Sequence, residues 1–115
     1  MNDIRIERLI TELDRYARRN LSDHRYEHSC RVAVFAENLA RRYGRSRRQQ
    51  RLCFLAGISH DMCKEKPIGF LLRTVQTDGQ PVSSDERARS ELLHGRAAAV
   101  LLLENYGIHK KSVLN

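Results

Sequence analysis

The chain has 115 residues, of which 41% are hydrophobic, so it can bury one modest core and is too short for several domains. Its formal charge of +7 favours anionic partners such as nucleotides, nucleic acid or phosphorylated metabolites. No apolar run approaches the ~18 residues of a membrane span, and the charged start MNDIRIERLI is unlike a secretory signal. We therefore expect one cytoplasmic domain, residues 1–115, that contacts no membrane.

Helical apolar spacing marks two helices in the first part of the chain. The first is predicted to start at Asp3, as its N-cap, and to end at Asn20. Ser22 is suited to cap a longer second helix, which Gly44 ends. The apolar positions expected to face the core are Ile4, Leu9, Ile10, Leu13, Tyr16 and Ala17 in the first helix, and Tyr26, Val32, Ala33, Phe35, Ala36, Leu39, Ala40 and Tyr43 in the second.

Two further helices come next in the chain. Ser46 is predicted to cap the third, whose apolar residues run up to His60. Pro67 suits the start of a fourth, over residues 68–77, because proline lacks an amide proton that would find no partner there.

The stretch TDGQPVSSDE, residues 77–86, is predicted to be a loop, with Ser83 or Ser84 capping the segment after it. A last helix is expected over roughly Arg96–Tyr106, ending at Gly107. No segment alternates with the period of two that is typical of a strand. The predicted fold class is all-α.

Histidines on three separate predicted elements are the most informative residues. His28 lies in the second helix, His60 ends the third and is followed by Asp61, and His94 precedes the last helix. Imidazole nitrogens and carboxylate oxygens together suit divalent iron, manganese or zinc, and a carboxylate can bridge two ions. Taken singly, each histidine is more often a hydrogen-bonded core or surface residue than a ligand.

The other two histidines are less informative. His24 and His28 are four residues apart, but the segment HRYEH differs from the H-E-x-x-H pattern of zinc proteases. We expect His24 to lie on the surface or behind the metal ligands, and His109 to be solvated near the start of a helix.

Three segments in this order carry a family resemblance: RYEHS (25–29), LAGISHDMCKEKP (55–67) and ELLHGRAAAVLLLENYGI (91–108). They resemble HD-domain phosphohydrolases, in the YqeK-type branch that is similar to symmetrical diadenosine tetraphosphate hydrolases. The resemblance implies an HD-domain helical bundle of about five to six helices. It also implies a dinuclear metal centre that usually contains iron, with manganese or zinc as alternatives, and a nucleotide substrate, a dinucleoside polyphosphate, hydrolysed to two nucleoside diphosphates.

Positions matched to the family's motifs receive roles from this resemblance. His28, His60 and Asp61 are expected to hold the first metal, and Asp61 to bridge to a second metal that His94 also binds. Lys64 matches the family's lysine after the His-Asp pair. It is therefore expected to contact substrate phosphate and, with Asp61, to serve catalysis.

Sequence proximity to the histidines adds two weaker candidates for substrate binding, Arg25 and Arg96. The alternative for Lys64 is a solvated lysine in a charged turn, a description that fits Lys66 equally.

The family carries a further histidine, in a His-Thr pair, and a later aspartate ligand beyond the point where this chain ends. Ile108, Val113 and Leu114 also look like the start of another helix without an end. We therefore expect an N-terminal part of a longer domain, incomplete at its C-terminus. A homodimer over exposed apolar faces is one way in which such a chain would be completed.

Two alternative functions stay open. One is hydrolysis of another nucleotide by the same HD core. The other is a non-catalytic basic module that binds nucleic acid through RRYGRSRRQQR, residues 41–51. Aromatic residues make up only 6% of the chain, with no tryptophan for base stacking, so we do not expect a nucleic-acid partner.

Overall fold

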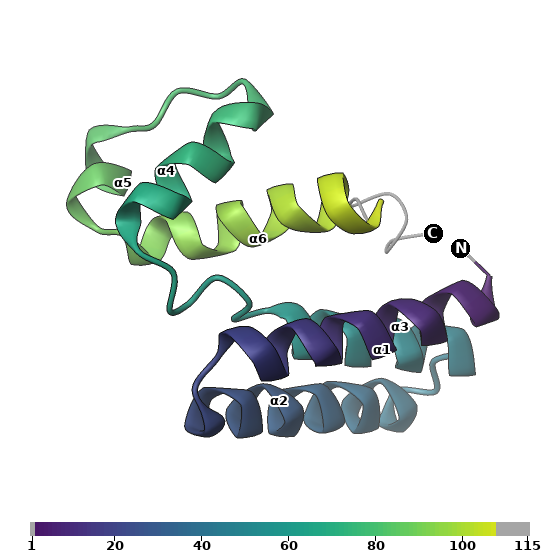
Figure 1. The fold of residues 1–115 in the computed structure, drawn as a ribbon. Coiled ribbons are helices and arrows are strands. Elements are labelled where there is room, and N and C mark those ends of the chain that lie inside the picture. Colours follow the sequence, from purple (N-terminus) through teal and green to yellow (C-terminus); the bar gives the residue numbers. More distant parts are fainter. Residues whose placement is uncertain (1, 108–115) are drawn as a thin grey trace. The chain divides into compact units, whose positions relative to one another are not determined.

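The computed structural model describes residues 2–107, and in this part the chain is all-α, as the sequence predicts (Figure 1). The described part contains no strand, and none of its helices is both long and apolar enough to cross a membrane. The chain divides into two compact units, Met1–Met62 and Cys63–Asn115. The elements are α1 (Asp3–Asn20), α2 (Asp23–Arg42) and α3 (Arg47–Ser59) in the first unit, and α4 (Ile68–Val75), the 3-10 turn η1 (Gln76–Asp78), α5 (Ser84–Ala88) and α6 (Glu91–Tyr106) in the second.

Side-chain caps fix where the helices begin. Ser22 and Ser46 accept hydrogen bonds from the first turns of α2 and α3, and Ser83 does so for α5, as predicted. The predicted cap of α1 is wrong by one residue, because the Asn2 side chain accepts the amide hydrogen bond. Asp3 instead lies in the first turn, where its negative charge meets the positive end of the helix dipole.

Helix ends follow the predicted glycine at α2 but depart from the prediction at α6. Gly44 adopts φ 71°, a left-handed conformation that glycine reaches without a Cβ clash. The last helix starts at Glu91, five residues before the predicted Arg96, so His94 lies inside α6 rather than before it. Leu93 is fully buried in the first turn and anchors this earlier start.

The first unit is built on α3, which packs against both α1 and α2. An apolar stripe with spacing of three and four residues along α1 faces inward, as expected of an amphipathic helix. The buried residues are Ile6, Leu9, Ile10, Leu13 and Ala17 from α1, Leu21, Ala33 and Ala40 from α2 and the turn before it, and Leu52, Leu55 and Ile58 from α3.

Ion pairs join the three helices beside this core. Arg51 of α3 donates to Glu7 of α1 at 2.7 and 3.0 Å, and to Glu37 of α2 at 2.6 Å. Arg48 pairs with Asp3 at 3.0 Å. The arginine run 41–51 therefore supplies contacts that hold α3 against its neighbours, in addition to exposed charge.

Small residues let α2 and α3 approach closely. A Cβ built on Gly57 would lie 2.5 Å from the Cα and 2.8 Å from the backbone nitrogen of Ala33. Ser29, one turn earlier on α2, is also fully buried. Since His28 precedes Ser29 and His60 follows Gly57 by three residues, this close approach positions both histidines.

The predicted apolar face of α2 is partly wrong. Phe35 is 67% exposed and Tyr43 is 74% exposed, and Leu39 is also exposed. The small side chains on the opposite side fill the contact with α3, which leaves the large ones outward. Ile4 of α1 is exposed as well. A homodimer over such faces stays a prediction.

The second unit is a pair of helices, α4 and α6, with α5 and a loop beside them. Leu71 and Val75 of α4 are fully buried, as are Leu93 and Ala97 of α6. Figure 1 shows η1 and the following loop leading from α4 back to α5. The start of α4 after Pro67 agrees with the prediction.

We predict that Gly57→Ala destabilises the first unit by about 1–3 kcal/mol, because the new methyl group meets the backbone of Ala33. Urea unfolding followed by circular dichroism measures the change. Gly95→Ala is the matched control, since its Cβ meets nothing within 4 Å and alanine favours a helix. Equal stability of the Gly57→Ala protein and the parent would contradict this account of the helix contact.

A second prediction concerns Tyr26, which links α1 and α2. Its hydroxyl donates to Asp14 at 2.5 Å and accepts from Arg18 at 3.0 Å. The hydrogen bond to Asp14, together with burial, raises the pKa of Tyr26 from 10.0 to about 12. The folded chain thus favours the neutral phenol, so its contribution to stability is complete below pH 10 and is lost as pH rises towards 12.

The Tyr26→Phe protein should lose about 1 kcal/mol at pH 7 and should show a smaller further loss between pH 10 and 12 than the parent. Denaturant midpoints at pH 7, 10 and 11.5 test this. Tyr43→Phe removes a hydroxyl from a 74% exposed ring and should leave the profile unchanged. Parallel alkaline profiles of the Tyr26→Phe protein and the parent would count against the proposed link.

Candidate metal centre

The candidate centre begins at the C-terminal end of α3. The helix ends at Ser59, whose hydroxyl donates to the carbonyl of Leu55 at 2.9 Å. His60 keeps a helical backbone conformation and Asp61 lies in the turn after it. The carbonyl end of a helix carries partial negative charge, which favours a cation at this point.

His28 reaches the same point from α2. Its Nε2 lies 3.8 Å from Oδ2 of Asp61, and Nε2 of His60 lies 3.2 Å from that oxygen. The two imidazole rings have centroids 5.5 Å apart. One ligand atom from each of the three side chains lies within 4.8 Å of the others.

A backbone hydrogen bond orients His60. Its Nδ1 lies 2.6 Å from the carbonyl oxygen of Gly57, and because a carbonyl only accepts, Nδ1 carries the proton. Nε2 is then the nitrogen that faces Asp61. This is the arrangement by which proteins commonly fix the tautomer of a metal-binding histidine.

The donor set fits a divalent metal. In the neutral ring, Nε2 of His60 and Oδ2 of Asp61 are both acceptors, so a cation shared between them would satisfy both at their separation of 3.2 Å. Metal bonds of ~2.0–2.2 Å place adjacent ligand atoms roughly 3 Å apart, close to this distance. The 3.8 Å separation from Nε2 of His28 to Oδ2 of Asp61 is longer than that.

Burial differs between the ligands. The Asp61 side chain is 15% exposed, whereas those of His28 and His60 are partly open to solvent. A shielded carboxylate interacts more strongly with a cation than a solvated one does, and the open histidine side leaves room for a water molecule or substrate.

The other predicted site residues, apart from Arg96, are not members of this cluster. His94 is a half-buried residue of α6 in the second unit, and its part in a dinuclear centre stays a prediction. Lys64 lies three residues after Asp61 in the turns that precede α4, and it is half-buried. Arg25 lies one turn before His28 on α2.

Arg96 makes contacts that the sequence does not predict. Its guanidinium donates to both carboxylate oxygens of Asp78 at 2.7 Å, to Glu86 at 3.1 Å, and to the carbonyl oxygens of Gln80 and Pro81 at 2.6 and 3.4 Å. These bonds use all five N–H donors of an arginine. Arg96 thus holds the loop between η1 and α5, and its contact with substrate phosphate stays a prediction.

This arrangement also sets the charge of the loop. The bonds from Arg96 lower the pKa of Asp78 to about 2. Backbone and side-chain hydrogen bonds from Ser83 and Arg96 likewise lower the pKa of Glu86. Both carboxylates are thus committed to the clamp around Arg96.

Sequence reasoning missed the residue that positions the cluster, Gly57. It permits the close approach to Ala33 and accepts the hydrogen bond from His60. The available signal is the set of small residues, Ser29, Ala33 and Gly57, at helical positions near the two histidines.

Comparisons with known proteins identify the family of this chain. The HD domain family model matches residues 25–115. The chain belongs to the HD domain family. Its matched region includes the cluster of His28, His60 and Asp61.

Two relatives are informative. Over 106 residues the chain is 34% identical to the symmetrical bis(5'-nucleosyl)-tetraphosphatase of Staphylococcus aureus (strain NCTC 8325 / PS 47), a match that covers 91% of this chain and 52% of that protein. It also resembles, with a TM-score of 0.76 and 30% identity, the crystal structure of a Clostridium acetobutylicum protein described as a predicted HD superfamily hydrolase involved in NAD metabolism. That match covers 91% of this chain and 54% of the other. The chain thus spans about half the length of the relatives it matches.

We predict that His60→Ala lowers the amount of bound divalent metal at least about 10-fold, because it removes the ligand whose tautomer is fixed by Gly57. Elemental analysis of protein purified without chelator measures metal per chain. His24→Ala is the control, since His24 is an exposed histidine of α2 outside the cluster. Full metal content in the folded His60→Ala protein would exclude this centre.

Proposed function

We propose that this chain is the N-terminal part of a metal-dependent phosphohydrolase that cleaves dinucleoside polyphosphates symmetrically. The observation that carries the proposal is the convergence of His28, His60 and Asp61, which come from two helices and present three metal-binding atoms to one point. Three protein ligands are the number that catalytic metal sites commonly use, with a further position open to water or substrate.

The choice of substrate rests on the tetraphosphatase relative, whose name states symmetrical cleavage of a bis(5'-nucleosyl) tetraphosphate. The proposed reaction takes diadenosine tetraphosphate and one water molecule and gives two molecules of ADP. The bond that breaks joins the two central phosphates. The chain spans about half of that relative, so the activity in the relative's name is carried over to this chain as a proposal only.

His28, His60 and Asp61 would hold the metal, which we propose to be iron, with manganese or zinc as alternatives suited to the same ligands. When bound, such an ion activates water and polarises phosphoryl oxygens. The shielded carboxylate of Asp61 would neutralise part of the metal's charge, and the Gly57 carbonyl would hold the proton of the neutral His60 ring on Nδ1, so that Nε2 is the nitrogen offered to the metal. We propose His94 as the ligand of a second metal that Asp61 bridges.

Lys64 would bind substrate phosphate, with Arg25 as a second candidate. A tetraphosphate chain carries several negative charges, and an ammonium group three residues after a metal ligand stabilises the charge that develops on it. Arg96 has no part in this proposal because its donors are used within its own loop.

A nucleic-acid-binding module is the less favoured function. Arg48 and Arg51 of the basic run are held in ion pairs with Asp3, Glu7 and Glu37, which reduces the charge offered to a phosphate backbone. Hydrolysis of another nucleotide by the same residues is the alternative that the substrate test must separate.

We expect iron- or manganese-loaded protein to convert diadenosine tetraphosphate to ADP as the only product, measured by anion-exchange chromatography. Lys64→Ala should lower kcat/KM by about 10–100-fold, because it removes a charged hydrogen bond to phosphate. Chelator should abolish turnover and added metal restore it.

Lys66→Ala is the matched control for this assay, because Lys66 lies in the same segment with its ammonium 5.1 Å from the centroid of the Phe70 ring. Its kcat/KM should stay close to that of the parent. Formation of AMP and ATP would contradict symmetrical cleavage. Turnover of a different nucleotide in preference to this one would favour the alternative substrate class.

A further inference from the structure

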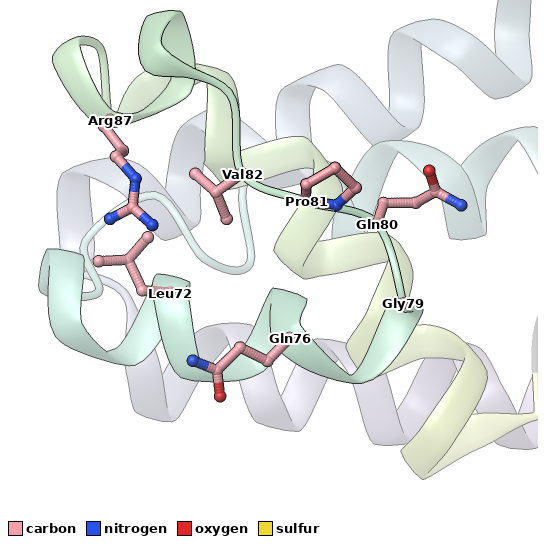
Figure 2. A pocket seen from close by; sticks show the side chains of 7 residues that line it. All are labelled: Leu72, Gln76, Gly79, Gln80, Pro81, Val82 and Arg87. Atoms are coloured by element: carbon pink, nitrogen blue, oxygen red, sulfur yellow. The ribbon is translucent and has the colours of Figure 1, made fainter.

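A pocket of about 490 Å³ lies in the second unit, between α4, the loop after η1, and α5 (Figure 2). Its volume falls in the range of roughly 300–1,000 Å³ in which proteins bind small organic ligands. Its lining shares no residue with the cluster of His28, His60 and Asp61.

The pocket has a wall of fixed shape. Arg96, whose side chain is only 17% exposed, holds Asp78 and Glu86 at the two ends of the loop and the carbonyls of Gln80 and Pro81 between them. A loop fixed at four points loses little further conformational entropy when a ligand binds to its outer side.

The lining contains one cation and no acidic residue. Arg87 of α5 is exposed and makes no ion pair with any residue of the described chain. Asp78 and Glu86 are committed to Arg96, and Asp85, the other carboxylate of α5, is exposed and lies outside the lining. An arginine in this setting favours an anionic group that accepts two parallel hydrogen bonds, such as phosphate.

The rest of the lining suits a flat apolar body with a polar edge. Leu72, Val82 and Pro81 supply the apolar surface, and the amides of Gln76 and Gln80 offer both donors and acceptors. Figure 2 shows Arg87 reaching from α5 towards Leu72 on α4, while the side chain of Gln80 points away from both. The cation and the Gln80 amide are therefore at opposite ends of the pocket.

We propose that this pocket binds a nucleoside monophosphate group, with the phosphate at Arg87 and the base against Leu72, Val82 and Pro81. Amides recognise the hydrogen-bonding edge of a nucleobase, and aliphatic side chains pack on its face. The inference goes beyond the proposed hydrolase function and does not depend on it, since the pocket needs no metal and none of the metal-binding residues.

Titration calorimetry with AMP tests the proposal, on chelator-treated protein that also carries His60→Ala so that no hydrolysis or metal binding contributes. We expect AMP to bind at least about 10-fold more tightly than either adenosine or inorganic phosphate, since each of these offers only half of the recognised group. Arg87→Gln should weaken AMP binding by about 10-fold or more. Arg89→Gln, an exposed arginine outside the lining, should leave AMP binding unchanged.

Three results would overturn the proposal. They are an absence of AMP binding up to millimolar concentration, equal affinity for AMP and inorganic phosphate, and unchanged AMP affinity in the Arg87→Gln protein. Because Arg87 is exposed, the Arg87→Gln protein should fold as the parent does, and circular dichroism verifies this. Failure of the hydrolase proposal would leave these measurements unaffected, since they are made without metal.

Discussion

The candidate metal centre depends on the close approach of α2 and α3 at Gly57 and Ala33. With no side chain at residue 57, the two backbones come near enough for His28 on α2 to face His60 and Asp61 at the C-terminal end of α3. A larger residue there would separate the helices by a fraction of an ångström or more. Ligand atoms now spread over at most 4.8 Å would then no longer share one ion.

Gly57 also takes part in the chemistry of the centre through its carbonyl group. The oxygen accepts the Nδ1 proton of His60, which turns Nε2 towards Asp61. One residue therefore combines a packing requirement with a requirement on the histidine tautomer. The helix dipole of α3 also favours a cation at this point, because its negative end lies at His60.

Much of the fold is determined by local sequence signals. Ser22, Ser46 and Ser83 cap helices where the sequence indicates, because a serine hydroxyl satisfies an amide of the first turn independently of tertiary structure. Local signals place the start of α6 five residues too late. The earlier start depends on the burial of Leu93, which is a tertiary contact and leaves no local signal in the sequence. The outward position of Phe35 has a similar origin. Apolar spacing shows that a helix has an apolar face, but it does not show that the small residues of α2 pack against α3 while the large ones face outward.

The candidate site is predictable to the extent that residue types determine its chemistry. The sequence indicates His28, His60 and Asp61 as ligands, and the structure brings them together. The contacts of Arg96 could not be predicted in this way, because proximity to His94 in the chain gives no information about Asp78, Glu86 and the loop carbonyls that accept its hydrogen bonds. Long-range partners of a charged side chain are visible only once the chain is folded.

The clamp around Arg96 has a consequence for measurements across acidic and neutral pH. The carboxyl group of Asp78 has a pKa of about 2, so it stays ionised from about pH 4 upwards. A phosphate monoester gains its second negative charge near about pH 6. If the affinity of the pocket in the second unit for a phosphate monoester changes between about pH 4 and pH 7, the change would then come from ionisation of the phosphate group. The loop that Arg96 holds would keep the same hydrogen bonds across these pH values.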